Sequence, residues 1–361
     1  GFGRAPGEGM EQVIERYILT VPTNRVTLAE AVKGAGYATA AYLGNPYLGP
    51  QVCDGVGRGF DRFWVAKAGP EAGAEVVVRG ANRWLAQNAD KPFLLWVHCL
   101  EPHSPYDPPR RPAAAAGSRE TFLRTHTADQ LRREKLHPGD VELLKALYDE
   151  EISYADAQIG TLLAALGTLG LAQQTVVCFF SDHGEEFQDH GSLGHGHTLY
   201  EEVIRVPCII AGPGVPVGVD EEPHRLIDLA PTLAFLCGMG VSEDWTGVNL
   251  LQGGAAGAEH SLIFSESLLY GPERKAIIRG QWKTVYTEGR GMEAFDLSAD
   301  PGERKATVLH RSPAELRESV AAYTGRMEKQ AQAWRAQQSP RPTALSEETR
   351  ESLRSLGYLG Q

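Results

Sequence analysis

Several features are missing from this chain, and each absence excludes a class of protein. No apolar run reaches the roughly 18 residues that a transmembrane helix needs. The cysteines have neither CxxC nor zinc-finger spacing. The chain has 35 Lys and Arg against 46 Asp and Glu, and its net charge of −11 argues against a nucleic-acid partner. An anionic substrate would therefore need a local pocket of cations.

The first residues, Gly1-Phe2-Gly3-Arg4, include neither an initiating Met nor a signal peptide. We therefore expect a longer chain that continues upstream, where any export signal would lie. The compartment stays open: a periplasmic or extracellular location would require such a signal. The odd number of cysteines favours buried free thiols over a disulfide framework. They are Cys53, Cys99, Cys178, Cys208 and Cys237.

Length and composition permit a large core and more than one domain. Helical and strand-like segments alternate up to about residue 259, which predicts an α/β fold with a mostly parallel central sheet sandwiched by helices. We expect a catalytic domain at 1–259 and a small antiparallel α+β subdomain with a tail at 260–361. Helices are expected at 27–36, after Pro70, at 141–166, 227–236 and 328–354; strands at 37–43, 93–98, 175–180, 205–211, 276–279, 282–286 and 295–297.

The apolar run at 175–180 predicts a strand in the middle of the parallel sheet, covered on both faces. It ends at Ser181-Asp182-His183-Gly184-Glu185, where ligands gather in open α/β sheets. Asp182 and His183 are both competent ligands for a divalent cation. An Asp-His pair at such a point is also common in turns and caps. Glu185 and Glu186 are interpreted as the first turn of a helix.

Two further histidine clusters are expected at the same edge of the sheet. His103 follows the strand at 93–98 among prolines that limit its backbone, and its imidazole could titrate near neutrality. The glycine-rich segment from His190 to His197 includes His195. Taken singly, His103 could be a loop residue packed against proline, and the second segment could be solvated surface. Their co-occurrence with Asp182 favours one binding site.

These motifs resemble those of bacterial-type sulfatases of the alkaline phosphatase superfamily. The resemblance is carried by residues 181–186, by Gly194 to Glu201 leading into Arg205-Val206-Pro207, and by Glu101 to Tyr106. It extends to 27–43, 148–160, 228–232, 279–283 and 353–358, and so covers nearly the whole chain.

The resemblance implies one divalent metal ion held partly by Asp182 and His183. Ca²⁺ is the expected ion, with Mg²⁺, Mn²⁺ and Zn²⁺ as alternatives. His103 would lie at the leaving-group oxygen as a catalytic residue. His195 is near the position where many family members have a sulfate-contacting Lys, and we favour it over His197, which would otherwise contact the substrate.

The chain also departs from the family pattern. The family places two metal-binding aspartates and a nucleophile motif, Cys/Ser-x-Pro/Ala-x-Arg, before the segment resembling 27–43. This sequence has no Asp-Asp pair and no such motif; Thr20 to Arg25 is the nearest imitation and is interpreted as a loop. Asn45 and Tyr47 replace a usual Lys and His. The resemblance therefore predicts an N-terminally incomplete sulfatase whose nucleophile lies upstream of residue 1.

The expected function is metal-dependent hydrolysis of a small-molecule or glycan sulfate ester, with the isolated chain inactive. One alternative is a phosphodiesterase or phosphonate monoester hydrolase of the same superfamily, because Asp-His ligation also suits phosphoryl transfer. Another is a truncated homologue that binds a metal and an anion without catalysis.

Overall fold

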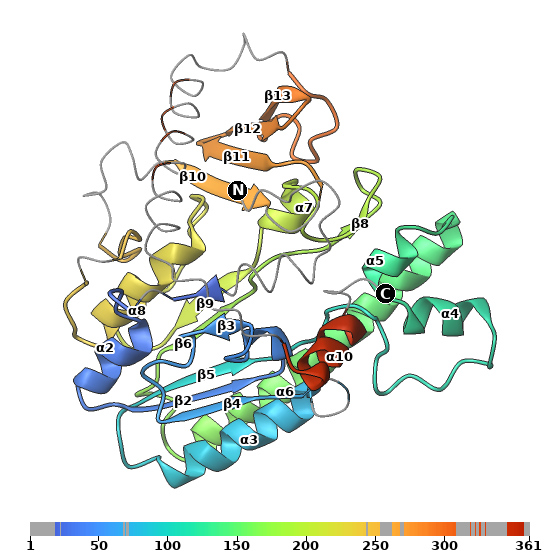
Figure 1. Cartoon of the computed structure of the whole chain (residues 1–361). Coiled ribbons are helices and arrows are strands. Elements are labelled where there is room, and N and C mark those ends of the chain that lie inside the picture. Colours follow the sequence, from blue (N-terminus) through green and yellow to red (C-terminus); the bar gives the residue numbers. More distant parts are fainter. Residues whose placement is uncertain are drawn as a thin grey trace.

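A computed structural model shows a layered α/β body next to a small antiparallel sheet (Figure 1). In the body, β2 (Ala38–Leu43) lies between β4 (Arg62–Val65) and β5 (Phe93–His98), and all three strands are parallel. The structure describes residues 19–21, 23–67, 69, 72–242, 245–252, 262–267, 271–307 and 345–356, with isolated positions between 318 and 329.

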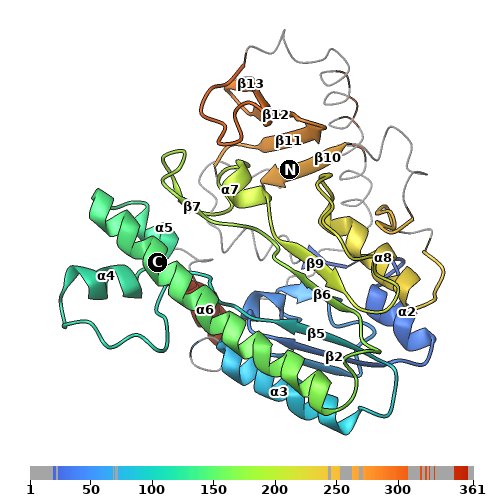
Figure 2. The same cartoon turned by 180° about the vertical axis from the view of Figure 1, so that it is seen from behind.

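The helices around this sheet form where the sequence predicts them. Thr27 and Glu30 make the expected capping box of α2 (Leu28–Gly34). The apolar face of α3 (Ala74–Gln87) is buried, and α3 lies beside the long helix α6 (Pro138–Thr168) in both views (Figures 1 and 2). A Cβ at Gly80 would lie 2.8 Å from the Tyr42 ring, so this glycine permits close packing of α3 on β2.

The expectation of a parallel, fully covered strand at 175–180 is wrong. β6 (Val177–Phe180) pairs antiparallel with β9 (Cys208–Ala211). Phe179 and Phe180 are 40% and 42% exposed, on opposite faces of this ribbon. An apolar run indicates a tendency to be buried but does not specify which strands pair with it. Within the described part of the chain, β9 is the one strand that pairs with β6.

The predicted antiparallel sheet near the C-terminus is confirmed. It is a meander of β10 (Ile263–Ser267), β11 (Arg274–Arg279), β12 (Trp282–Thr287) and β13 (Gly291–Asp296), of which β10 was not predicted. It lies beside α7 (Glu201–Ile204) in both views.

The remaining elements have at most nine residues each. They are β1 (Leu19–Thr20), η1 (Pro46–Leu48), β3 (Cys53–Asp54), α4 (Arg119–Thr125), α5 (Ala128–Leu131), β7 (Glu186–Phe187), β8 (Leu193–Gly194), η3 (Leu226–Asp228), α8 (Leu229–Leu236) and α10 (Glu347–Ser355).

Three smaller expectations have mixed outcomes. All five cysteines are free, but only Cys53 is buried and Cys208 is exposed. The helix expected at 141–166 is α6, although its apolar residue Ile152 is 44% exposed. Of the predicted helix at 328–354, α10 lies among the described residues and most of the rest lies outside them. No described helix is long and apolar enough to span a membrane.

Candidate active site

The ends of β5 and β6 lie close to each other, as the sequence predicts. His98 is the last residue of β5 and interacts electrostatically with Asp182 and His183, which directly follow β6. Burial lowers the pKa of His98. Polar groups delivered by two separate strands therefore share one small volume.

Three histidines from three segments converge at this point. The rings of His183 and His195 stack with centroids 3.8 Å apart and planes 27° from parallel. The His103 ring meets that of His195 edge-on, with centroids 5.1 Å apart. The structure thus brings together all three clusters that the sequence singled out, and His195 is their centre.

Asp182 and His183 offer two donors for a metal ion. The Asp182 side chain is 69% exposed, and its Oδ2 lies 3.8 Å from His183 Nε2. His183 Nδ1 is 2.8 Å from the Gly184 carbonyl, which favours a proton on Nδ1 and leaves the Nε2 lone pair available. In the part of the chain described, no three His, Cys, Asp or Glu side chains form a metal cluster. These two residues fit a divalent ion but supply only part of its coordination.

The interpretation of Glu185 and Glu186 as a helical turn is wrong. Glu185 lies outside any helix, directly before β7, and its buried carboxylate accepts a hydrogen bond from Tyr106 Oη (2.8 Å) and lies 3.0 Å from His195 Nδ1. Burial raises the pKa of Glu185, but the contacts with His195 and Tyr106 outweigh it and lower the pKa overall. Glu185 is therefore a buried carboxylate that orients His195. A sequence pattern alone could not separate this role from a helix start.

Residues 190–200, named here the histidine loop, are organised by Glu186. This residue is fully buried, and its carboxylate accepts hydrogen bonds from His190 N (3.1 Å), Ser192 N (2.7 Å) and Thr198 Oγ1 (3.0 Å). The alternative of a solvated surface loop is therefore wrong. Close packing continues at Gly184, where a Cβ would lie 2.1 Å from the Glu202 carbonyl oxygen.

His103 does not titrate near neutrality as expected. Burial, and next the neighbouring His195, lower its pKa to about 4. Its Nδ1 lies 2.7 Å from the Ser104 carbonyl oxygen. The imidazole is therefore neutral at pH 7, and its Nδ1 is positioned to donate to that carbonyl.

His197, the last histidine of the loop, faces two arginines that no sequence motif singles out. His197 Nε2 contacts the Arg132 guanidinium, and Arg274 donates to the His197 carbonyl. Burial, then Arg132, lowers the pKa of His197 to about 3. Arg132, at the end of α5, also pairs with Asp129. Because arginine is always charged, Arg132 places a positive charge beside His197, with Asp129 as its ion-pair partner.

Two residues of the sequence motifs have structural roles. The Glu101 carboxylate accepts from Ala74 N at 3.0 and 3.1 Å and so caps the N-terminus of α3. The Asn45 side chain accepts from Tyr47 N at 2.9 Å and caps the short η1.

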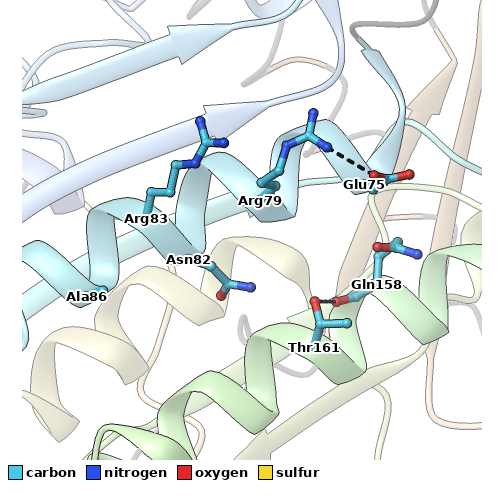
Figure 3. A pocket seen from close by; sticks show the side chains of 7 residues that line it. All are labelled: Glu75, Arg79, Asn82, Arg83, Ala86, Gln158 and Thr161. Carbon is cyan, nitrogen blue, oxygen red and sulfur yellow. Dashed lines mark hydrogen bonds and ion pairs between the residues drawn. The ribbon is translucent and has the colours of Figure 1, made fainter.

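A separate groove of about 370 Å³ lies between α3 and α6 (Figure 3). Arg79, on α3, pairs with Glu75 there. None of the residues predicted for metal or substrate binding contributes to it. Its lining consists of Glu75, Arg79, Asn82, Arg83, Ala86, Gln158 and Thr161.

The low pKa of His103 predicts acid sensitivity of the fold. Between about pH 6.5 and pH 4 the unfolded chain binds a proton at this histidine that the native chain does not, so stability is full above pH 6.5 and falls on acidification. The titration of His103 lowers the free energy of unfolding by roughly 3 kcal/mol over this range. We expect the urea midpoint to drop between pH 7 and pH 4 and the drop to be smaller in His103→Asn. An equal drop in both proteins would contradict this.

Comparison with known proteins identifies the family of this chain. The sulfatase family model matches residues 8–239. The choline-sulfatase of Rhizobium meliloti (strain 1021) is 35% identical over 170 residues, which cover 45% of this chain and 33% of that protein. The delta 4,5-hexuronate-2-O-sulfatase of Bacteroides thetaiotaomicron is 31% identical over 172 residues, covering 44% and 36%. The chain thus spans only about a third of the length of these relatives.

The solved structure of a 2-O GAG sulfatase aligns with a TM-score of 0.66 and 21% identity, covering 92% of this chain and 83% of that one. At this identity the likeness establishes a shared fold. The sulfatase family match covers well over half of the chain and includes His103, Asp182-His183 and His195. This protein therefore belongs to the sulfatase family of the alkaline phosphatase superfamily.

Proposed function

We propose that this protein, with its nucleophile segment upstream of residue 1, hydrolyses sulfate esters to an alcohol and inorganic sulfate. The observation that carries this proposal is the cluster of His103, His183 and His195 beside Asp182. It combines donors for a cation with imidazoles suited to an anion and to proton transfer. We further propose that residues 1–259 form the catalytic unit and 260–361 a small subdomain with a tail.

Sulfatases generally use a divalent metal ion, and we propose Ca²⁺ for this protein. Asp182 and His183 would provide part of its ligands, completed by aspartates of the nucleophile segment. An oxygen-rich ligand set suits calcium. When bound, the ion stabilises negative charge on the sulfate oxygens.

His103 is proposed as the group that protonates the leaving alcohol. Its imidazole is neutral at pH 7 without substrate. An approaching anionic sulfate raises the pKa of a nearby histidine, so His103 would acquire its proton together with the substrate. It could then pass that proton to the oxygen of the breaking ester bond.

His195 is proposed to contact the sulfate, since Glu185 holds its ring at Nδ1 and leaves Nε2 for the substrate. His197, next to Arg132, would contact the substrate from the other part of the loop. The substrate class is a small-molecule or glycan sulfate ester, in agreement with the choline- and hexuronate-sulfatase relatives.

The test uses the gene with its natural upstream coding sequence. The encoded protein, supplied with Ca²⁺, is assayed on an aryl sulfate and on the matching aryl phosphodiester. We expect the sulfate ester to be turned over faster than the phosphodiester. Asp182→Asn should abolish the activity that Ca²⁺ supports. Faster phosphodiester turnover would assign the superfamily's phosphodiesterase chemistry instead. Calorimetric Ca²⁺ binding without turnover of either substrate would indicate a non-catalytic homologue.

A further inference from the structure

The small C-terminal sheet contacts the histidine loop at several points: Arg274 donates to the His197 carbonyl, and a buried lysine pairs with the residue that follows the loop. Lys283, on β12, is fully buried, and its Nζ lies 3.0 Å from Glu201 Oε1 and 2.8 Å from Glu303 Oε1. Glu201 directly follows the histidine loop, whereas Glu303 follows β13. This lysine therefore joins two parts of the chain that are far apart in sequence.

Glu303 extends the connection with its other polar atoms. Its Oε2 accepts from Glu201 N (2.7 Å), and its backbone carbonyl lies 3.3 Å from His190 Nε2. Glu303 has a φ of 50°, a left-handed conformation that non-glycine residues rarely adopt. Such a backbone persists where surrounding contacts specify it, and here Lys283 is one of those contacts.

Apolar packing on the same face of the sheet reinforces these polar contacts. Leu199 and Tyr200 of the histidine loop pack against Ala276, Val285 and Phe295. Phe295 lies directly opposite Lys283 in the ladder, so the lysine and these apolar residues share one face. The face of the sheet that covers the loop therefore has a charged centre and an apolar surround.

We propose that Lys283 is a positioning residue that, through Glu201 and Glu303, holds the histidine loop so that His195 reaches His183. A lysine between two carboxylates stabilises the group only while all three are together, because removing the cation leaves the buried Glu303 carboxylate next to the partly buried Glu201 carboxylate without a counter-charge. The loop would then lose its anchor at Glu201, which lies five residues after Gly196. This inference deepens the proposed function but concerns loop order, which can be measured without turnover.

The sheet supplies a matched control. Lys275, on β11, is only 5% exposed and pairs with Glu273 at 3.0 Å. In the register of β11 and β12 it lies on the face opposite that of Ala276 and Val285. Lys275→Met removes a buried, ion-paired lysine from the same sheet without touching the histidine loop.

The experiment is amide hydrogen exchange by mass spectrometry on purified chains. In Lys283→Met we expect exchange in peptides covering 188–201 to accelerate roughly 100-fold or more. Peptides covering 274–287 should keep their protection. Lys283→Arg should restore most of the loop protection, and Lys275→Met should leave it unchanged.

A second variant keeps the inference testable if Lys283→Met loses the whole sheet. Glu201→Ala leaves Lys283 paired with Glu303 and leaves the Glu201 N–H bond to Glu303, and it removes only the ion pair between Lys283 and Glu201. Faster exchange confined to 188–201 would therefore support the positioning role. Unchanged exchange in Glu201→Ala, or equal loop opening in Lys275→Met, would overturn it. Because neither readout requires turnover, failure here is distinct from failure of the proposed sulfatase activity.

Discussion

Purified residues 1–361 should show negligible sulfatase activity, whereas the protein restored with its upstream segment should be active. The reason is chemical: the sequence has no Asp-Asp pair and no nucleophile motif, and Asp182 and His183 provide only part of a metal shell. Enzymes accelerate reactions by about 10⁶-fold or more, so the two proteins should differ by at least several orders of magnitude. Release of nitrophenol from an aryl sulfate measures both.

The control for this prediction is the restored protein with its nucleophile replaced by alanine. It should fold like the active protein and match residues 1–361 in rate. Robust turnover by residues 1–361 alone would show that a nucleophile exists within this sequence, and the proposed mechanism would have to be abandoned.

In the restored protein, His103→Ala should slow hydrolysis of alkyl sulfates by about 10² to 10⁴-fold, the usual contribution of a general acid. Aryl sulfates with acidic phenols should be affected much less, because their leaving oxygens need little protonation. The measurement is kcat/KM across leaving groups of rising pKa, in which the variant should show a steeper dependence than the parent.

His224→Ala is the matched histidine control. His224 pairs with Asp220 in an exposed segment and contacts none of the three clustered histidines. Its rates should equal those of the parent on every substrate. An unchanged rate of His103→Ala on an alkyl sulfate would remove His103 from the leaving-group position.

The sequence predicts those parts of the fold that are encoded by local pattern. The capping box at Thr27 and the apolar face of α3 depend on spacings of three and four residues, which can be counted directly. The pairing of β6 could not be predicted in this way. It depends on partners distant in sequence, and the run of apolar residues is the same for a covered and an exposed strand.

The candidate site likewise contains some residues that local sequence patterns identify and others that they do not. Asp182, His103 and His195 follow recognisable strands or glycine-rich motifs, so the sequence identified them. Arg132 reaches the site from another segment of the chain, and no local spacing links it to the clustered histidines. The low pKa of His103 likewise arises from burial and from His195, which only the folded structure brings into contact.

The contact between Glu303 and the histidine loop has a consequence for the order in which the protein matures during synthesis. Glu303 lies 102 residues after Glu201, and ribosomes add about 5 to 20 residues per second. The nascent histidine loop would therefore wait on the order of 5 to 20 seconds for its anchor. During that interval the chain would have made Asp182 and every clustered histidine, yet the ribosome would still be translating the segment that fixes their arrangement.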